Sequence, residues 1–337
     1  GTDLRDYLTL DDTVYTIKLT PNRADCLSLT GIAREVAALT DRPLSLVDTA
    51  GVAPGIADIR NVVLDAPEAC PRYCGRIVRG VNAQAPTPEW MKQRLARSGI
   101  RSISALVDVT NYVMLELGQP LHAFDNAKLS GAIHVRLPNP GEEVLLLNGQ
   151  TVTPAGDTLL IADESRALAL AGVMGGEDSG ITLETTELFL ESAFFAPDAI
   201  AGRARAYGFS SDASYRFERG VDPSRTVEII ERITQLVIEI CGGAAGPISD
   251  QTLQLPPATP VTLRVARAAR VIGMPLTQAD CATALRRLGF ALEEGDGTLV
   301  VTPPPHRFDL SIEEDLIEEV ARLVGFNNLP TSAPLAP

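Results

Sequence analysis

Apolar residues recur at helical spacing in several stretches of the chain, and this pattern predicts helices with one buried face. Glycine or proline follows most of these stretches, as is usual where helices end. The expected N-caps are Thr87 for the second helix and Asp108 or Thr110 for the third. Ser311 and Glu314 have the spacing of a capping box for the last. We expect helices at 32–39, 88–98, 111–117, 226–241, 278–288 and 309–326.

Other stretches are short and rich in apolar and β-branched residues, and they predict strands. The dipeptide Asn148-Gly149 and the run 295–297 mark the turns of two hairpins. Strands and helices are mixed along the chain without strict alternation, which predicts an α+β fold. The expected strands before the second hairpin are 61–66, 73–81, 132–137, 142–152, 157–163, 167–175 and 186–195.

Two turn-rich segments divide the chain into three parts. Small residues, glycine and proline gather at 47–58, and prolines gather at 247–260. The predicted parts are a first block at 1–57, a large block at 58–250 and a small block at 258–330.

Composition narrows the class of protein. The 337 residues are 45% hydrophobic and 21% charged with a net charge of −14, which suits a globular chain and argues against a general nucleic-acid binder. No apolar run reaches the roughly 18 residues that cross a bilayer, and no signal peptide is evident. Five cysteines without a CxxC pair predict reduced thiols. We therefore expect a cytoplasmic protein without membrane contact.

The segment VDVTNYVMLELGQPLHAFD (107–125) places polar side chains in an otherwise apolar run. Its helix would end at Gly118, and His122, one of three histidines, follows a turn that contains proline. Two interpretations remain open from the residues alone. Thr110, Asn111 and His122 either satisfy caps and buried backbone groups, or they form one wall of a polar site.

Three further features bear on such a site. The segment ALAGVMGGEDSGI (169–181) has four glycines, which either let the backbone approach a ligand or make a tight turn. Glu191 interrupts an apolar strand and points either to solvent or into a pocket, where its burial needs a partner. Arginines and aromatics alternate over 203–219, which suits either single-stranded RNA or a solvated surface over structural aromatics.

Acidic residues gather around the start of the last expected helix. Asp315, Glu318 and Glu319 share one helical face, and Asp309 precedes them. Carboxylate oxygens at this spacing suit Mg²⁺, which prefers oxygen ligands. The other interpretation is a solvated acidic face near a helix N-terminus, where the dipole also favours acids.

Six segments of the chain together resemble the β subunit of bacterial phenylalanine–tRNA ligase (phenylalanyl-tRNA synthetase). They follow one another in the family's order from residue 21 to residue 330. The segments are PNRADCLSLTGIAREVAAL, ALVDVTNYVMLELGQPLHAFD, LAGVMGGEDSGI, FLESAFF, SDASYRFERGVDPS and RFDLSIEEDLIEEVARLVGFNNLP. The chain begins with Gly rather than Met, and we expect a central fragment of such a subunit.

The resemblance implies an identity for each part of the chain. Residues 1–57 would be the C-terminal part of a split first domain plus a linker. Residues 58–250 would be a mixed-sheet tRNA-editing domain, and 258–330 a small winged-helix-like domain similar to DNA-binding modules. The full enzyme would be a cytoplasmic α2β2 tetramer whose α subunit attaches Phe to tRNA(Phe). It would use ATP, which this fragment does not bind, and Mg²⁺, which the two subunits share.

The resemblance also implies roles for single residues. Thr110, Asn111 and His122 match editing-site positions that would orient a water or the terminal ribose. Glu191 matches the carboxylate that would accept the hydroxyl of Tyr, a group that Phe lacks. The pocket walls would be Gly172, Gly175, Gly176, Ser211, Asp212 and Ala213, where Ser211 departs from the family's Thr. The shared Mg²⁺ would bind Asp309, Asp315, Glu318 and Glu319.

The implied reaction is hydrolysis of the ester between Tyr and the 3′ end of tRNA(Phe). An apolar pocket cannot strongly reject a near-isostere that adds one hydroxyl, so a second site must. The chain has neither a Ser-His-Asp pattern nor a zinc motif, and positioning of a water is expected to dominate catalysis. The alternative is a non-catalytic module that binds tRNA and holds the subunits together.

Overall fold

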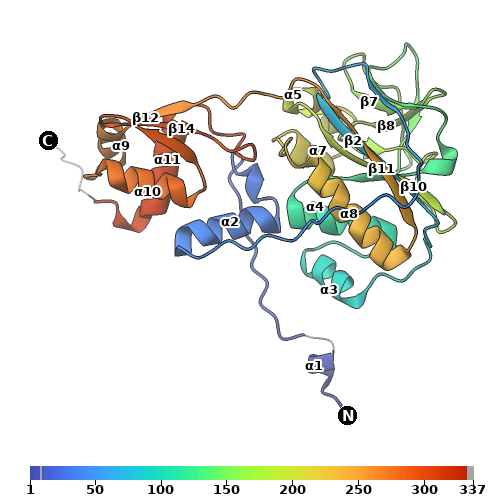
Figure 1. Ribbon diagram of the computed structural model, residues 1–337, viewed down its shortest axis with the longest axis horizontal. Helices are drawn as coiled ribbons and strands as arrows, with labels where there is room; N and C mark the ends of the chain where they lie inside the picture. Colours follow the sequence, from blue (N-terminus) through green and yellow to red (C-terminus); the bar gives the residue numbers. More distant parts are fainter. Residues whose placement is uncertain (8–9, 332–337) are drawn as a thin grey trace.

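The computed structural model describes residues 1–7 and 10–331 (Figure 1). A large and a small unit both contact helix α2 (Leu29–Thr40), and their mixture of helices and sheets confirms the α+β class. Before α2 lie the helix α1 (Leu4–Tyr7) and the 3₁₀ helix η1 (Ala24–Cys26). No helix within the described residues has the length and apolar composition that spanning a membrane requires.

A four-stranded antiparallel sheet forms the centre of the large unit. Its strand order is β11 (Ala244–Thr252), β2 (Arg72–Arg79), β10 (Glu187–Phe194) and β3 (His122–Asp125). Strands β2 and β10 are buried on both faces, which explains why apolar residues of β10 do not alternate strictly with polar ones. The register pairs Glu191 with Gly75 on β2 and with His122 on β3.

Three helices lie on one side of this sheet, where two pack against its strands and the other packs against a neighbouring helix (Figure 1). They are α3 (Glu89–Arg97), α4 (Ala105–Leu117) and α8 (Thr226–Cys241). Their apolar sides share one hydrophobic core with Leu188 and Leu190 of β10. The 3.6-residue spacing that predicted α8 therefore corresponds to a buried stripe against the sheet.

Helix α4 begins earlier than predicted, because Ser104 rather than Asp108 or Thr110 is its N-cap residue. Asp108 is fully buried, and its carboxylate accepts hydrogen bonds from the Ile103 N–H and the Thr87 hydroxyl. Thr87 is therefore not the side-chain cap of α3, which the sequence had predicted. Asp108 instead ties the start of α4 to the segment before α3.

A five-stranded sheet covers the other face of the central sheet. Its strand order is β1 (Val62–Leu64), β4 (Ile133–Arg136), β7 (Leu160–Ala162), β8 (Ala167–Leu170) and β9 (Met174–Gly175). Strands β1 and β4 are parallel, and the other neighbours are antiparallel. A second hydrophobic core, which contains Phe124, Phe189 and Phe195, fills the space between the two sheets.

Short elements complete the large unit. The predicted hairpin is present as β5 (Val144–Leu145) and β6 (Thr151–Val152), and Gly149 in its turn has a φ of +81°. Only glycine adopts such a φ without strain, which is why the Asn-Gly pair marks this turn. The short helices are η2 (Asn126–Lys128), α5 (Pro197–Ile200), α6 (Arg203–Ala206) and α7 (Asp212–Phe217).

The small unit is a three-stranded antiparallel sheet packed against helices. Its strand order is β12 (Val261–Arg264), β14 (Thr298–Thr302) and β13 (Ala291–Glu294), with the β13–β14 hairpin where the sequence predicts it. The helices are α9 (Val265–Ile272), α10 (Gln278–Arg287), α11 (Glu313–Val324) and η3 (Phe326–Asn328). The likeness to a winged helix stays a prediction.

The N-terminus of α11 differs from the predicted capping box. The Asp315 carboxylate accepts hydrogen bonds from the backbone N–H groups of Ser311 and Ile312, at 2.8 and 2.9 Å. Glu314 instead pairs with Arg267 of α9. Asp315, one position after Glu314, therefore satisfies the backbone N–H groups that precede the helix. Glu314 forms an ion pair with the neighbouring helix instead.

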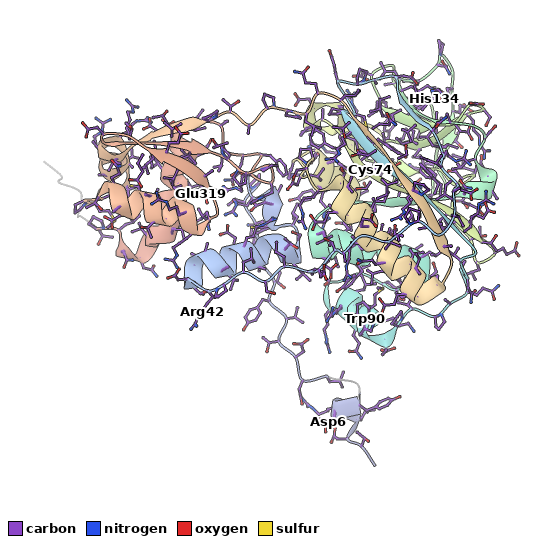
Figure 2. All side chains as sticks on the ribbon, in the orientation of Figure 1. Asp6, Arg42, Cys74, Trp90, His134 and Glu319 are labelled. Carbon is purple, nitrogen blue, oxygen red and sulfur yellow. The ribbon has the colours of Figure 1, made fainter. Side chains whose placement is uncertain are left out.

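An ion-pair network joins the small unit to α2. The Glu319 side chain (Figure 2) is 1% exposed and accepts hydrogen bonds from Arg307 at 2.9 Å and from Arg322 at 2.6 Å. Arg322 also pairs with Glu35 of α2, which pairs with Arg23 at 2.6 Å. Removing one member of such a network leaves buried charges uncompensated, which is costly.

Replacing Glu319 by Gln should destabilise the protein by about 3 kcal/mol at neutral pH, because Arg307 and Arg322 lose their counter-charge. Burial opposes ionisation of Glu319, but the two arginines outweigh it and lower its pKa to about 2. The stabilisation is complete above the unfolded pKa of 4.5 and is lost as the pH falls towards 2. Chemical unfolding at about pH 7 and about pH 3 measures both effects. Glu318→Gln, exposed on the same helix, is the control, and equal losses in both variants would contradict this role.

Candidate functional site

A small cavity lies between the two sheets, where β3 and β10 face β8, β9 and helix α7. Two polar side chains, Glu191 and His122, face this cavity. The apolar side chains that line it include Ile161, Leu170, Val173, Met174, Ala213 and Phe217. An apolar wall with a few polar groups is typical of sites that bind small molecules.

Glu191 and His122 reach the cavity because they are cross-strand neighbours. Residues of β10 alternate between faces, so Glu191 shares the face of Phe189, whereas Leu190 packs against the helices. Glu191 is 7% exposed, so of its two interpretations the one in which the side chain points into a pocket is correct. Within the described residues His122 Nε2 has no hydrogen-bond partner, and the ring lies edge-on to Phe124 with 4.3 Å between centroids.

Burial sets the charge states of these two side chains. It raises the pKa of Glu191 to about 7, although a hydrogen bond from Tyr73 opposes the rise. Burial also lowers the pKa of His122 to about 4. At neutral pH His122 is therefore neutral, while Glu191 is partly ionised. A carboxylate that accepts hydrogen bonds, next to a neutral imidazole, can bind an otherwise apolar ligand that carries one polar group.

Two of the three predicted wall glycines line the cavity. Gly172 has a φ of +66°, and a Cβ there would collide with aromatic side chains of the core. A Cβ at Gly175 would lie 2.4 Å from Cε1 of His122, so the imidazole packs directly on the backbone of β9. Gly176 does not line the cavity, and its lack of a side chain instead allows close approach to the Leu168 carbonyl.

The predicted wall segment 211–213 contributes one lining residue and one supporting contact. Ala213 lines the cavity. Ser211 caps α7, and its hydroxyl donates to the Val173 carbonyl at 2.7 Å, which holds the helix against the cavity wall. Asp212 lies outside the cavity, where it is exposed and pairs with Arg216 at 3.1 Å.

Thr110 and Asn111 do not line the cavity. They belong to α4, whose buried residues pack in the core on the helical face of the central sheet. His122 lies with Phe124 on the opposite face. The Thr110 hydroxyl donates to the Val107 carbonyl of its own helix at 2.7 Å. The structure therefore separates the three residues that the sequence groups together, and only His122 faces the cavity.

Within the described residues, the four acidic side chains that the resemblance assigns to Mg²⁺ do not form one site. Glu319 and Asp309 both accept hydrogen bonds from Arg307, at 2.9 and 2.8 Å. Asp315 lies in the first turn of α11, where its carboxylate accepts a hydrogen bond from the Ile312 N–H, and Glu318 is exposed. The guanidinium of Arg307 therefore lies between the carboxylates of Glu319 and Asp309, in the position that a metal cation would occupy. In this arrangement the set does not fit Mg²⁺ within the chain.

Another acidic group lies at the α2 junction. Among the described residues, only Asp25, Cys26 and Glu35 bring three possible ligand atoms within 4.8 Å of one another. The guanidinium of Arg23 donates to all three, at distances from 2.6 to 3.2 Å. An arginine therefore supplies the positive charge of this cluster, which belongs to the ion-pair network.

The arginine-rich segment 203–219 has both buried and exposed side chains. Arg216 is buried, and Phe217 belongs to the core between the sheets. The guanidinium of Arg219 lies 3.6 Å from the ring centroid of Tyr215. The burial of Phe217 fits the interpretation of structural aromatics, whereas Arg205 and Tyr215 are exposed, and RNA binding by this segment stays a prediction.

Tyr73 is a site residue that the sequence did not indicate. Its side chain is fully buried, and its hydroxyl donates to Glu191 Oε2 at 2.8 Å. In the sequence, an aromatic residue at the start of an expected strand indicates only an ordinary core position. The pairing of β2 with β10 brings Tyr73 to Glu191, and no local pattern contains that pairing.

Family models match both units of this fold. Residues 69–242, which include the cavity, match the B3/4 domain, and residues 261–326 match the tRNA synthetase B5 domain. The first match covers more than half of the chain, so the chain belongs to the B3/4 domain family.

The curated relatives are phenylalanine–tRNA ligase beta subunits, which confirms the resemblance seen in the sequence. The proteins of Aromatoleum aromaticum, Dechloromonas aromatica and Burkholderia lata are 66%, 63% and 54% identical, over at least 99% of this chain. The chain spans 42% of the length of each relative. A solved N-terminal fragment of the Pyrococcus horikoshii phenylalanyl-tRNA synthetase beta subunit aligns over 96% of this chain and 95% of its own. Its TM-score is 0.43 and its identity 14%, a likeness too distant to carry an argument.

Replacing Glu191 by Gln should stabilise the protein at about pH 8 and have little effect at about pH 4.5. The raised pKa means that the unfolded chain ionises at a pH where the folded protein resists ionisation. A shift from 4.5 to about 7 corresponds to a cost on the order of 3 kcal/mol above the folded pKa. The gain in melting temperature should therefore grow between these pH values and then level off. Glu187→Gln on the same strand is the control, and a gain independent of pH would contradict this cause.

Proposed function

We propose that this chain carries the editing site of a phenylalanine–tRNA ligase β subunit and hydrolyses Tyr wrongly attached to tRNA(Phe). The observation that carries the proposal is the apolar cavity with Glu191 and His122 as its polar groups. The B3/4 domain match over this region and the names of the relatives agree with it.

Glu191 is the group that would distinguish Tyr from Phe. Its Oε2 accepts a hydrogen bond from Tyr73, whereas Oε1 has no protein donor within the described residues and can accept from a phenol hydroxyl. Phe would displace water from this carboxylate and leave it unpaired, at a cost of about 1–3 kcal/mol. A site built to bind a hydroxyl therefore rejects the analogue that lacks one.

The hydrolysis consumes one water at the ester carbonyl. The water oxygen bonds to the carbonyl carbon, the bond from that carbon to the ribose oxygen breaks, and the ribose oxygen takes up a proton. His122 is neutral at pH 7, and its unpartnered Nε2 can orient the water or the ribose hydroxyl. Gly172, Gly175 and Ala213 shape the wall around the side chain of Tyr. Thr110 and Asn111 have no contact with the reacting atoms in this proposal.

The whole assembly belongs to the proposal as well. We infer a cytoplasmic α2β2 ligase, in which the α subunit uses ATP and Mg²⁺ to attach Phe to tRNA(Phe). This chain would contact the α subunit and tRNA(Phe), and it would receive the wrongly charged 3′ end from the synthetic site. The winged-helix-like unit and the acids Asp309, Asp315, Glu318 and Glu319 would lie near the subunit interface in that assembly.

A non-catalytic module that binds tRNA(Phe) and holds the subunits is the alternative function. The lining of the cavity favours it, because within the described residues no Ser, Cys or Lys nucleophile lines the cavity with Glu191 and His122. Both functions predict binding of tRNA(Phe), but only editing predicts release of Tyr.

The chain should release Tyr from Tyr-tRNA(Phe) faster than Phe from Phe-tRNA(Phe). Glu191→Ala should reduce this preference at least about tenfold, because the acceptor for the phenol hydroxyl is lost. His122→Ala should slow release of both amino acids. Release of radiolabelled amino acid measures these rates, with Glu187→Ala as the control. Binding of Tyr-tRNA(Phe) without release would support the scaffolding alternative, and unchanged rates in both variants would reject the site.

A further inference from the structure

The hydrogen bond from Tyr73 to Glu191 joins the two central strands of the sheet. The residue directly opposite Glu191 on β2 is Gly75. A Cβ at Gly75 would lie 2.3 Å from the ring of Phe189, so that ring covers the position and no side chain there can reach the carboxylate. Tyr73 lies two residues away on the same face, and its hydroxyl reaches Glu191 Oε2 at 2.8 Å.

The two oxygens of Glu191 therefore have different surroundings. Oε2 is held by the Tyr73 hydroxyl, and within residues 1–7 and 10–331 no hydrogen bond from the protein reaches Oε1. Glu191 lines the cavity, whereas Tyr73 does not. The arrangement leaves Oε1 available to a ligand, while the hydroxyl of Tyr73 occupies Oε2.

We propose that Tyr73 is a positioning residue, which favours the ionised form of Glu191 and aims its free oxygen into the cavity so that the site recognises a hydroxyl group. This role rests on the proposed editing function, because it concerns how the same cavity separates Tyr from Phe. Tyr73 acts through Glu191 and does not touch the ligand itself.

Ionisation matters because the two forms of the carboxyl group recognise different partners. A carboxylate only accepts hydrogen bonds and binds a hydroxyl strongly, whereas a protonated carboxyl group can also donate and binds it more weakly. Burial favours the protonated form and raises the pKa of Glu191 to about 7, against the hydrogen bond from Tyr73. Without that bond, the protonated form would dominate at neutral pH.

Within the part of the chain that the structure describes, no group near Glu191 other than Tyr73 favours its ionised form. His122, from β3, is neutral because burial lowers its pKa to about 4. The Cys70 thiol, before β2, has its pKa raised well above the ordinary value by burial, and it stays protonated. The residues of β7, β8, β9 and α7 that line the cavity are not titratable. Among the described residues, Tyr73 is therefore the group that favours the charge on Glu191.

The test uses Tyr73→Phe, which removes the hydroxyl and keeps the ring in the core. A hydrogen bond to a charged group shifts a pKa by about one to two units. Near pH 7, the preference for deacylating Tyr-tRNA(Phe) over Phe-tRNA(Phe) should fall about tenfold. It should recover near pH 9, because the pH midpoint of this preference rises by about one to two units. A role in packing alone would instead lower activity equally at every pH, and that result would overturn the proposal.

A second measurement separates failure of this role from failure of the proposed function. The carboxyl carbon of Glu191, followed by ¹³C NMR in the full chain, reports its ionisation whether or not the chain deacylates tRNA. The titration midpoint should rise by about one to two pH units in Tyr73→Phe. Tyr207→Phe is the matched control, because the Tyr207 hydroxyl bonds to Thr158 away from Glu191. Its midpoint for Glu191 should stay unchanged.

Each outcome then has one meaning. An unshifted Glu191 titration in Tyr73→Phe overturns the positioning role, even if the chain edits Tyr. A shifted titration in a chain that releases no Tyr supports the tie between Tyr73 and Glu191 and rejects the editing function. In the Glu191→Gln background, Tyr73→Phe should leave the pH profile of deacylation unchanged, and a further pH-dependent loss there would show that Tyr73 acts on another group.

Discussion

The burial of strand β10 on both faces is the constraint on which the rest of the large unit depends. One face of β10 packs against α4 and α8, and the other packs against the second sheet, so both hydrophobic cores meet along this strand. A carboxylate on such a strand has little access to bulk water and destabilises the fold unless a partner compensates it. Glu191 is such a residue, and its only protein donor within the described residues is the hydroxyl of Tyr73.

The same constraint decides which residues can share the cavity. Side chains of β3 and β10 that alternate in one direction face the second sheet, where the cavity lies, and those that alternate the other way contact the helices. His122 and Glu191 are opposite one another and therefore share a face. Thr110 and Asn111 are close to His122 in sequence but lie on α4, beyond the sheet. Closeness along the chain is a poor guide here, since a helix and the next strand lie in different layers.

The sequence predicted the parts of the fold that local patterns determine and missed those that pairing determines. The stripe of α8, the Asn-Gly hairpin and the hairpin at 295–297 each follow from spacing or turn chemistry, and each is present. The start of α4 was wrong because Asp108, a good N-cap by type, is drawn into buried hydrogen bonds with Thr87. Glu191 was recognisable as a polar interruption of an apolar strand, whereas Tyr73 had no signal until β2 and β10 were paired.

Two buried glutamates of this chain show how the partner, rather than burial itself, decides what a carboxylate can do. Glu319 and Glu191 are 1% and 7% exposed, yet their pKa values move in opposite directions, to about 2 and about 7. Arg307 and Arg322 hold Glu319 fully ionised, and such an ion pair is structural because it leaves the carboxylate no capacity for a ligand. Tyr73 offers Glu191 a single neutral donor, which holds one oxygen and leaves the carboxylate near its midpoint at neutral pH. A polar group whose hydrogen-bonding capacity is only partly filled by the protein gains most from a ligand that fills the rest. A ligand hydroxyl would supply the hydrogen-bond donor that the cavity does not offer to the second oxygen of Glu191.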